Sequence, residues 1–371
     1  MKILILSDIN SAHTEKWVRG LCEMGVSVCL FSFSTPVIQW YSELKNFKIG
    51  FTPSVSNKNK GLIGKIGYLT HLPSLTKCIS EFEPDLVHAH YASSYGLLGK
   101  LSGFHPFMVS VWGADVYDFP NSSWFNKKVL KSVLKSADHI SSTSNSMAIE
   151  TGKYTDKQIQ TIPFGINISD FKCKERKRIL ATDKIVIGSI KSLTPKYGTD
   201  YLIQTFHQLT VERPELNLKL LLVGGGSHID EYRQLVHSLN LEDKVTFTGF
   251  IALEEVPMYH CKIDIFASLS VLDSESFGVS LVEAMASGSK IVATKVSGFK
   301  EVLRDCNSYG LMIAPKSTEE AKTAILDIIT NAADAEERSV AALERVKESY
   351  EWQNNLAEML DAYRQLMKTK P

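Results

Sequence analysis

Two glutamates, Glu275 and Glu283, are the side chains whose type and spacing could act on a polar substrate. Between them, Phe277, Gly278 and Val279 are typical of a loop that turns into a helix. The first amides of a helix have no partner within it and lie at the positive end of its dipole, so this turn could hold a phosphate. Glu283 would lie about 7 Å further along, at ~1.5 Å per residue, where its carboxylate could accept two hydrogen bonds from the diol of a sugar ring. Glu275, before the turn, would face whatever group is attached to the other side of the phosphate.

An alternative interpretation of the same stretch is a solvated helix that carries two ordinary acids. The residues around Glu283 favour the first interpretation, because they leave little polar face for a carboxylate and a buried glutamate without a partner is rare. These apolar neighbours are Leu281, Val282, Ala284, Met285 and Ala286.

The pattern of an acidic residue, seven others and a second acidic residue, set in Ser-Phe-Gly…Glu-Ala-Met-Ala-x-Gly, resembles a known family. It is similar to the retaining, nucleotide-sugar-dependent glycosyltransferases of family 4 (glycosyl transferases group 1), which have the GT-B fold. In that family the first glutamate contacts the donor sugar and the second contacts the ribose of the nucleotide. The resemblance implies these roles for Glu275 and Glu283, covers nearly the whole chain and is strongest in its second half.

The loop from Gly188 to Gly198 extends this resemblance. In the family a basic residue followed by Lys-Gly holds the diphosphate of the donor, and Lys191 and Lys196 match those positions. Two cations and a helix N-terminus can stabilise the charge of a diphosphate leaving group without a metal ion. The chain departs from the family in having Lys191 where arginine is usual and Tyr197 before the glycine. Ordinary solvated loop lysines are the alternative.

Two glycine-containing turns, at Gly224 and Gly249, are candidates for the nucleotide-binding surface. Leu221-Leu222-Val223-Gly224-Gly225-Gly226 is a strand that runs into a Gly-rich turn, which could let a nucleotide approach the backbone or only reverse the chain. Phe247-Thr248-Gly249-Phe250 resembles the family segment beside the base. Neither is a G-x-G-x-x-G motif, and the first turn of the chain, residues 7–13, contains no glycine, which argues against a dinucleotide-dependent oxidoreductase.

Polar and aromatic residues follow predicted strands in the first half of the chain. His13, His90, Trp112 and Asp115 lie where open α/β sheets bind ligands and are candidates for contact with the acceptor or the sugar. Many relatives carry a histidine near the position of Trp112 and a Gly-Gly turn where this chain has residues 10–14. Each candidate could instead be a structural hydrogen-bonding residue.

Apolar runs without alternation, separated by stretches with helical spacing, predict parallel sheets covered on both faces. We therefore expect an α/β protein with the GT-B architecture, two Rossmann-like doubly wound domains facing across a cleft. The N-terminal, acceptor-binding domain is expected at residues 1–170 and the nucleotide-sugar-binding domain at 171–371. The resemblance alone implies that the last helix, Trp352–Met367, packs back on the first domain. The predicted strands are Lys2–Ser7, Val26–Phe33, Leu86–His88, Phe107–Val111, His139–Ser142, Gln158–Ile162, Ile185–Ser189, Lys219–Val223, Val245–Thr248, Ile263–Ala267 and Lys290–Ala293.

Composition predicts a cytoplasmic protein. No stretch approaches ~20 apolar residues, and the first residues resemble a strand rather than a signal peptide. The six cysteines show no C-x-x-C pair and no zinc spacing, so we expect them to be reduced and structural. The 10 histidines form no H-E-x-x-H motif and there is no Asp-x-Asp pair, so we expect no metal and no cofactor apart from the nucleotide-sugar substrate.

The net charge of zero hides an asymmetry, because residues 1–180 contain 21 basic and 14 acidic residues and the remainder contain 20 and 27. The basic half suggests an anionic partner, and a lipid diphosphate acceptor or a membrane surface fits better than nucleic acid, for which no recognition motif is found. Lys128, Lys131 and Lys135 lie on one face of a predicted amphipathic helix that could contact lipid. Residues Lys58, Lys60 and Lys65 would add to this surface. An ordinary surface helix is the alternative.

The function predicted from the sequence is that of a retaining glycosyltransferase of hexosyltransferase type that uses a UDP- or GDP-sugar and a glycan or lipid-linked acceptor. A role in bacterial surface polysaccharide synthesis, at the inner face of the cell membrane, is an expectation from the type of relative. The alternatives are a non-catalytic GT-B partner subunit and a GT-B nucleotide-sugar epimerase or phosphorylase. A non-catalytic subunit would be expected to lose one of the two glutamates or both lysines, and the chain retains them.

Overall fold

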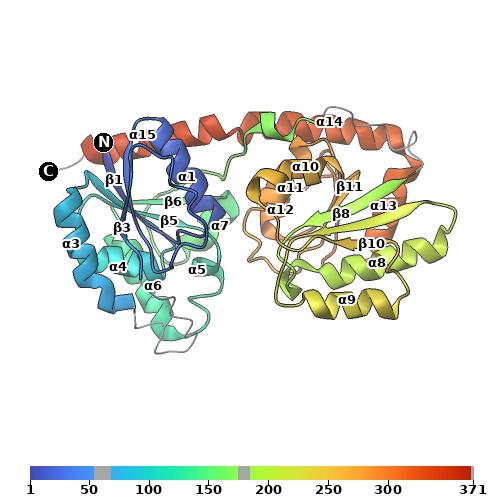
Figure 1. Cartoon of the computed structure of the whole chain (residues 1–371), viewed down its shortest axis with the longest axis horizontal. Helices are drawn as coiled ribbons and strands as arrows, with labels where there is room; N and C mark the ends of the chain where they lie inside the picture. The colour runs from blue at the N-terminus through green and yellow to red at the C-terminus, as the bar shows by residue number, and fades with distance from the viewer. Residues whose placement is uncertain (54–67, 174–183, 369–371) are drawn as a thin grey trace. The chain divides into compact units, whose positions relative to one another are not determined.

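The computed structural model describes residues 1–53, 68–173 and 184–368, which divide into two compact units (Figure 1). Unit 1 comprises Met1–Phe164 and Asn354–Pro371, and unit 2 comprises Gly165–Gln353. The division thus falls just before the boundary expected at residue 170, and the end of the chain groups with unit 1. Lys58, Lys60 and Lys65 lie outside the described residues.

Unit 1 is built on a seven-stranded parallel sheet in the order β3-β2-β1-β4-β5-β6-β7. Its central strands are buried almost throughout because helices cover both faces. The chain moves outward from β1 to β3, returns, and then continues from β4 in the other direction, so the switch point lies between β1 and β4. The strands are β1 (Lys2–Leu6), β2 (Ser27–Phe31), β3 (Phe47–Phe51), β4 (Leu86–His90), β5 (Phe107–Val111), β6 (His139–Ser142) and β7 (Ile159–Thr161).

The helices of unit 1 pack on the sheet through alternating strand side chains. Leu75, Leu98 and Leu130, from α3, α4 and α6, join one core with Val87 of β4. The neighbouring side chain, His88, points to the opposite face, where its Nδ1 lies 2.7 Å from the hydroxyl of Tyr363 on α15. The helices are α1 (Ala12–Glu23), α3 (Leu72–Phe82), α4 (Ser94–Ser102), α5 (Ala114–Tyr117), α6 (Trp124–Ser136), α7 (Asn145–Gly152) and α15 (Trp352–Lys368).

Unit 2 repeats this architecture with a six-stranded parallel sheet in the order β10-β9-β8-β11-β12-β13. Its switch point lies between β8 and β11. Helices α8, α9 and α13 contribute to a large apolar core on one face of the sheet. The strands are β8 (Ile185–Ile190), β9 (Leu218–Val223), β10 (Val245–Phe247), β11 (Ile265–Ser268), β12 (Lys290–Thr294) and β13 (Leu311–Ile313). The helices are α8 (Thr199–Glu212), α9 (Ile229–Ser238), α10 (Val256–Cys261), α11 (Val279–Ala286), α12 (Ser297–Val302), α13 (Thr318–Thr330) and α14 (Ala332–Ser349), with short 3-10 turns including η2 (Ile168–Phe171) and η4 (Pro195–Tyr197).

The α/β architecture with two doubly wound, Rossmann-like domains is therefore confirmed. Two strands were not predicted, β3 and β13, and both lie at a sheet edge. Within the described ranges no helix has both the length and the apolar content needed to cross a bilayer.

The prediction that all six cysteines are reduced was wrong for one pair. Cys173 and Cys261 form a disulfide that joins the segment after η2 to the end of α10. The two residues are 88 positions apart, so only the fold brings them together. The other four cysteines, Cys22, Cys29, Cys78 and Cys306, are free thiols.

Candidate active site

The carboxyl ends of β8 and β11 bring Lys191 and Glu275 together in unit 2. Lys191 directly follows β8, and Glu275 lies in the loop after β11, the adjacent parallel strand. Parallel strands end at the same edge of a sheet, and this edge at the switch point is where such sheets bind ligands. The Nζ atom of Lys191 lies 2.9 Å from Oε2 of Glu275.

The Lys191–Glu275 pair is shielded from solvent. The two side chains are only 12% and 9% exposed, and a carboxylate in such a place is costly unless it is paired and hydrogen-bonded. The hydroxyl of Ser270 donates a second hydrogen bond to Oε2 of Glu275 at 3.2 Å. The Lys191 ammonium also lies 5.1 Å from the ring centre of Tyr197, whose pKa is raised to about 12 by burial and then by the charge of Glu275.

Lys196 approaches the same loop from the turn η4. Its Nζ atom donates to the carbonyl of Ser274 at 2.8 Å, the residue immediately before Glu275. The two lysines that the sequence singled out therefore both contact the loop that carries Glu275. The two ammonium groups therefore place positive charge around the Glu275 carboxylate at the carboxyl-terminal edge of the sheet.

The turn into α11 forms as the sequence predicted. Gly278 has φ +91°, and a Cβ atom there would lie 2.5 Å from the ring of Phe299, so only glycine fits. Helix α11 begins at Val279, and its first turn presents amides that no residue of the helix can satisfy. The buried hydroxyl of Ser280, in that turn, has no hydrogen-bond partner within the described residues. Buried polar atoms are normally satisfied, so an anion at this helix start fits the site.

Glu283 lies on α11 and contacts a histidine that sequence reasoning missed. The Nε2 atom of His260, at the end of α10, lies 3.1 Å from Oε2 of Glu283. His260 is fully buried, and its ring packs edge-on against Phe171 at 5.6 Å between ring centres. The next residue, Cys261, forms the disulfide. The backbone of His260 is therefore anchored by this bond, and its ring is held between Phe171 and Glu283.

Gly224 and Gly249 adjoin at the ends of β9 and β10. The amide of Gly224 donates to the carbonyl of Gly249 at 3.1 Å. Gly224 has φ +127°, and a Cβ atom there would lie 2.1 Å from the carbonyl oxygen of Lys191. These glycines therefore allow the ends of β9 and β10 to lie close to Lys191 at the end of β8. Beside them Phe250 is 86% exposed, and its ring covers Gly225, which places a bare aromatic face at the rim of this surface.

In unit 1 the structure brings His13, His90 and Trp112 into one aromatic cluster. The ring of His13 stacks on Phe164 with 4.0 Å between centres and meets Trp112 edge-on at 5.8 Å. His90 lies against Trp112 at 4.3 Å, and its Nδ1 is 3.0 Å from the hydroxyl of Ser7. Burial holds the pKa of His90 well below its usual value, so this imidazole is neutral at pH 7.

Asp115 has a structural task in the same region. Its carboxylate is 1% exposed and accepts hydrogen bonds from the amides of Ala92 (2.8 Å), Trp112 (3.1 Å) and Gly113 (2.9 Å). Burial raises the pKa of this carboxyl group above its usual value, and the hydrogen bonds from backbone amides offset only part of this effect. Asp115 thus ties the loops after β4 and β5 together.

An open cavity of about 530 Å³ lies beside Asp115 at the switch point between β1 and β4. Carboxylates, hydroxyls and aromatic rings line it, and no lysine or arginine does. Asp8 follows β1, and Tyr91 follows β4 with a left-handed φ of +71°, a conformation that often marks functional sites. Its lining includes Asp8, Tyr91, Ser94, Asp115, Asp118 and Phe119.

Neither unit presents a metal-ligand set in the residues that the structure describes, where no three His, Cys, Asp or Glu side chains cluster. The negative groups of the unit 2 site are matched by lysines and a histidine rather than grouped with one another.

Comparison with known proteins identifies the family. Residues 171–345 match the family model "Glycosyl transferases group 1", and residues 2–144 match "Glycosyl transferase 4-like". Solved structures agree with the fold: sucrose-phosphate synthase from Thermosynechococcus elongatus superimposes with a TM-score of 0.81, 20% identity and full coverage of both chains. Anabaena HepE in complex with UDP and glucose superimposes with a TM-score of 0.79 and 20% identity, covering 99% of this chain and 100% of the other. The chain belongs to the group 1 glycosyltransferases and has the GT-B fold.

Among characterised relatives, the GDP-mannose-dependent alpha-(1-6)-phosphatidylinositol monomannoside mannosyltransferase of Mycobacterium tuberculosis is 26% identical over 217 residues. This match covers 56% of this chain and 56% of that protein, so the chain spans about half the length of the curated relatives that it matches first.

Proposed function

We propose that the protein is a retaining glycosyltransferase that moves a sugar from a nucleotide-sugar held by unit 2 to a hydroxyl of a glycan or lipid-linked acceptor held by unit 1. The observation that carries this proposal is the Lys191–Glu275 pair at the start of α11. It combines a carboxylate for sugar hydroxyls, a cation for phosphate and a helix N-terminus at the switch point of one sheet.

Each part of the unit 2 site then has a role toward the donor. Lys191, Lys196 and the first amides of α11 hold the diphosphate, and Glu275 accepts hydrogen bonds from the sugar. Glu283, oriented by His260, accepts from the ribose hydroxyls. The close backbone approach at Gly224 and Gly249 lets the nucleotide lie against the strand ends, with Phe250 as an aromatic face for the base. The aromatic cluster and the cavity of unit 1 receive the acceptor, and His13, His90 and Trp112 are its proposed contacts.

Binding of the donor requires the Lys191–Glu275 pair to rearrange. In the free protein these two charges neutralise each other at 2.9 Å. When a diphosphate arrives, the ammonium can turn to its oxygens and release the carboxylate for the sugar. The bond from the anomeric carbon to the diphosphate then breaks, and the acceptor oxygen forms its bond on the same face. The acceptor proton passes to the departing phosphate, so we assign no protein nucleophile.

The chain's own cations stand where a divalent metal would otherwise neutralise the leaving group. We therefore propose that transfer is metal-independent, with two lysines and a helix N-terminus stabilising the charge that develops. The base of the donor is left open between uridine and guanosine, because one relative is named for GDP-mannose and one structural neighbour holds UDP. We also propose that the reaction belongs to bacterial surface polysaccharide synthesis on the cytoplasmic side of the membrane. The relative named for a phosphatidylinositol monomannoside supports the lipid-linked acceptor.

Thermal unfolding with a panel of UDP-, GDP-, ADP- and dTDP-sugars in EDTA tests donor binding. A ligand at ~100 times its dissociation constant adds roughly 2.7 kcal/mol to the free energy of unfolding, and we expect this with one nucleotide class. The stabilisation should be lost in Glu283→Gln and kept in Glu254→Gln, a control in an exposed turn of unit 2. No stabilisation by any nucleotide-sugar would favour a non-catalytic partner subunit.

Analysis of the product by NMR separates the remaining alternatives. An α-linked donor should give an α-linked product at a new hydroxyl, and a β-linked product would contradict retention. An epimerised nucleotide-sugar or a free sugar phosphate as the main product would contradict glycosyl transfer to an acceptor.

A further inference from the structure

Helix α6 of unit 1 carries an exposed face with an unusual composition. Lys127, Lys128, Lys131 and Lys135 are all exposed, and residues 119–137 contain no aspartate or glutamate. At 100° per residue these lysines and Trp124 lie along one side of the helix. Leu130, Val133 and Leu134 lie on the other side and are fully buried in the core of unit 1. We name the exposed side the lysine face of α6: Trp124, Phe125, Lys127, Lys128, Lys131 and Lys135.

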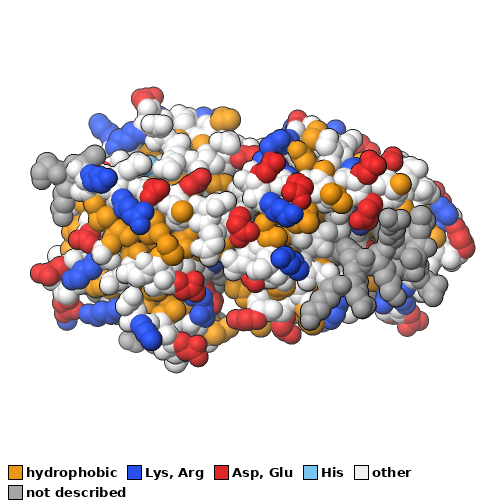
Figure 2. All heavy atoms as spheres, turned by 90° about the horizontal axis from the view of Figure 1, so that it is seen from above, with side chains coloured by type: hydrophobic (Ala, Val, Ile, Leu, Met, Phe, Trp, Pro, Cys, Tyr) orange, Lys and Arg blue, Asp and Glu red, His pale blue; other side chains and the backbone are white. Residues whose placement is uncertain are grey.

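The lysines of this face have no acidic partners in the described part of the chain. Some helical lysines elsewhere are paired with an acid three or four residues away, such as Lys77 with Glu81 and Lys347 with Glu344. Basic and acidic side chains are likewise interspersed on the face that Figure 2 shows. Within the described residues the ammonium groups of α6 contact only rings: Lys128 lies 4.6 Å from the ring centre of Trp124, and Lys127 lies 5.9 Å from that of Tyr154. The positive charge therefore faces solvent without compensation.

Large aromatic side chains stand exposed where α6 begins. Trp124 is 71% exposed and Phe125 is 61% exposed, and Ser123 caps the helix start by accepting from the amide of Asn126 at 3.1 Å. Exposed aromatic residues of this size cost free energy in water unless something covers them. Tryptophan beside lysine is the composition that favours the interface between lipid headgroups and acyl chains.

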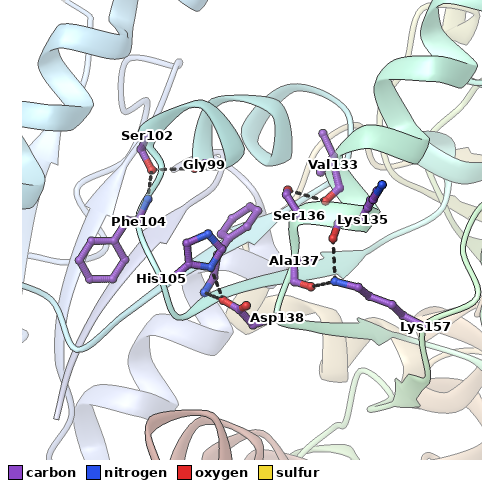
Figure 3. Close-up of polar contacts among 11 residues, drawn as sticks. Gly99, Ser102, Phe104, His105, Val133, Lys135, Ser136, Ala137, Asp138 and Lys157 are labelled. Atoms are coloured by element: carbon purple, nitrogen blue, oxygen red, sulfur yellow. Dashed lines mark hydrogen bonds and ion pairs between the residues drawn. The ribbon is translucent and has the colours of Figure 1, made fainter. Parts of the chain in front are cut away.

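The other end of α6 is bonded to the segment before β7, which carries Lys157 (Figure 3). Lys157 donates to the carbonyl of Lys135 at 2.7 Å and also to that of Ala137, which adds a fifth cation at the helix C-terminus. The nearest acid after the helix, Asp138, accepts from the amide of Phe107 at 2.7 Å and contacts His105, so it is engaged with the β5 side of the unit. Asp118, before the helix, and Asp138, after it, are the two exposed acids that flank it in the described sequence from residue 118 to 138.

We propose that the lysine face of α6 docks the protein on an anionic lipid surface, with Trp124 and Phe125 inserted at the headgroup level. Charge complementarity selects this occupant: four unpaired ammonium groups along about 12 Å of helix match a plane of phosphate headgroups, and the aromatic pair matches the apolar layer below it. Each lysine near such a surface raises partitioning about five-fold. The inference does not depend on the proposed function, but it would bring unit 1 to a lipid-linked acceptor.

Vesicle flotation of the full chain tests this docking directly. We expect the protein to float with vesicles of 70% phosphatidylcholine and 30% phosphatidylglycerol at low salt, not to float with phosphatidylcholine alone, and to be released by 0.5 M NaCl because salt screens the charges. The variant Lys128→Glu/Lys131→Glu/Lys135→Glu should bind at least ~100-fold more weakly. The matched variant Lys45→Glu/Lys48→Glu/Lys77→Glu makes the same charge change at exposed lysines of unit 1 outside α6 and should bind as the wild type.

Fluorescence gives a second readout that a loss of folding would not mimic. Trp17, Trp40, Trp112 and Trp352 are buried, so Trp124 dominates any change on contact with vesicles. Its emission should shift to shorter wavelength with anionic vesicles, and Trp124→Phe should remove the shift while leaving flotation. Trp124→Ala/Phe125→Ala should weaken flotation about ten-fold, whereas Val37→Ala/Ile38→Ala, at other exposed apolar residues of unit 1, should not.

Three outcomes would overturn the inference. One is the absence of flotation with anionic vesicles at low salt. Another is an equal loss in the two charge variants, which would show general attraction of a basic unit rather than docking through α6. The third is flotation without any change in Trp124 emission.

Discussion

The candidate donor site of unit 2 and the aromatic cluster of unit 1 occupy equivalent edges of two similar sheets, yet they are built from different chemistry. In unit 2 the working side chains are charged and paired, as in Lys191 with Glu275. In unit 1 the corresponding edge holds stacked rings such as His13 on Phe164, a neutral buried histidine and a carboxylate already bonded to three amides. The difference suggests that unit 2 is prepared for a diphosphate, whereas the aromatic cluster of unit 1 offers a ligand ring faces and a neutral imidazole.

The disulfide gives the largest expected difference between the units. Cys173–Cys261 closes a loop of 88 residues in unit 2, and loops of this size gain about 4 to 5 kcal/mol from cross-linking in the chain-entropy model. In unit 1, Cys29 and Cys78 are buried thiols whose sulfur atoms lie 3.6 Å apart. We expect a reducing agent to lower the melting temperature of the wild type, and Cys173→Ser to melt at that lower temperature with or without it. An unchanged melting curve on reduction would show that the bond does not form in solution.

Removal of the charge of Glu275 should have the next largest effect. Glu275→Gln keeps the shape of the side chain but withdraws the carboxylate from the sugar and leaves Lys191 unpaired. We expect turnover to fall ~100-fold or more, the size found when one preorganised group that acts on the transition state is lost. Steady-state kinetics with Glu254→Gln as the control measures this effect, and turnover within threefold of the wild type would remove Glu275 from the catalytic site.

Glu283 and His260 should affect binding more than turnover. Loss of a hydrogen bond to a charged group costs about 1.5 to 3 kcal/mol, so Glu283→Gln should weaken donor binding roughly 10-fold or more. His260→Phe should weaken it by a similar factor, because the ring remains but no longer orients the carboxylate. Donor titrations on both variants measure the effect. If His260→Phe binds the donor as tightly as the wild type, the contact between His260 and Glu283 has no role in donor binding.

The smallest effect concerns the pH dependence of unit 1. Burial, together with the nearby His139, lowers the pKa of His88 to about 3, and burial lowers that of His90 as well. Groups whose folded pKa is depressed stabilise the fold above their ordinary value of ~6.5, and this stability is lost as the pH falls toward the folded pKa. Between pH 6.5 and 5.5 we expect a loss of about 1 kcal/mol for each histidine. Urea unfolding followed by tryptophan emission reports mainly on unit 1, which holds Trp17, Trp40, Trp112 and Trp124. A midpoint that does not move over this range would contradict neutral burial.

The sequence predicted the central strands and the unit 2 site because both depend on short stretches of chain. Buried parallel strands such as β5 appear as continuous apolar runs, and the turn at Gly278 lies within one motif. Of the four edge strands, β7 and β10 were predicted and β3 and β13 were missed. Strand β3 has no fully buried residue, and Lys48 and Gly50 interrupt its apolar pattern. His260 and the disulfide were missed for a different reason. Their partners are 23 and 88 residues away, and neither distance leaves a local pattern.

Isothermal titration calorimetry of a nucleotide-sugar and of its nucleoside diphosphate, each against wild type and Glu275→Gln in EDTA, tests the central claim most directly. The claim is that Glu275 faces the sugar while the lysines, the start of α11 and Glu283 hold the nucleotide. We expect Glu275→Gln to bind the nucleoside diphosphate within about threefold of the wild type, since only one hydrogen-bonding group has changed. It should lose the additional affinity that the sugar provides. Equal affinity of both proteins for the nucleotide-sugar, or binding only when a divalent metal is added, would contradict this assignment of the site.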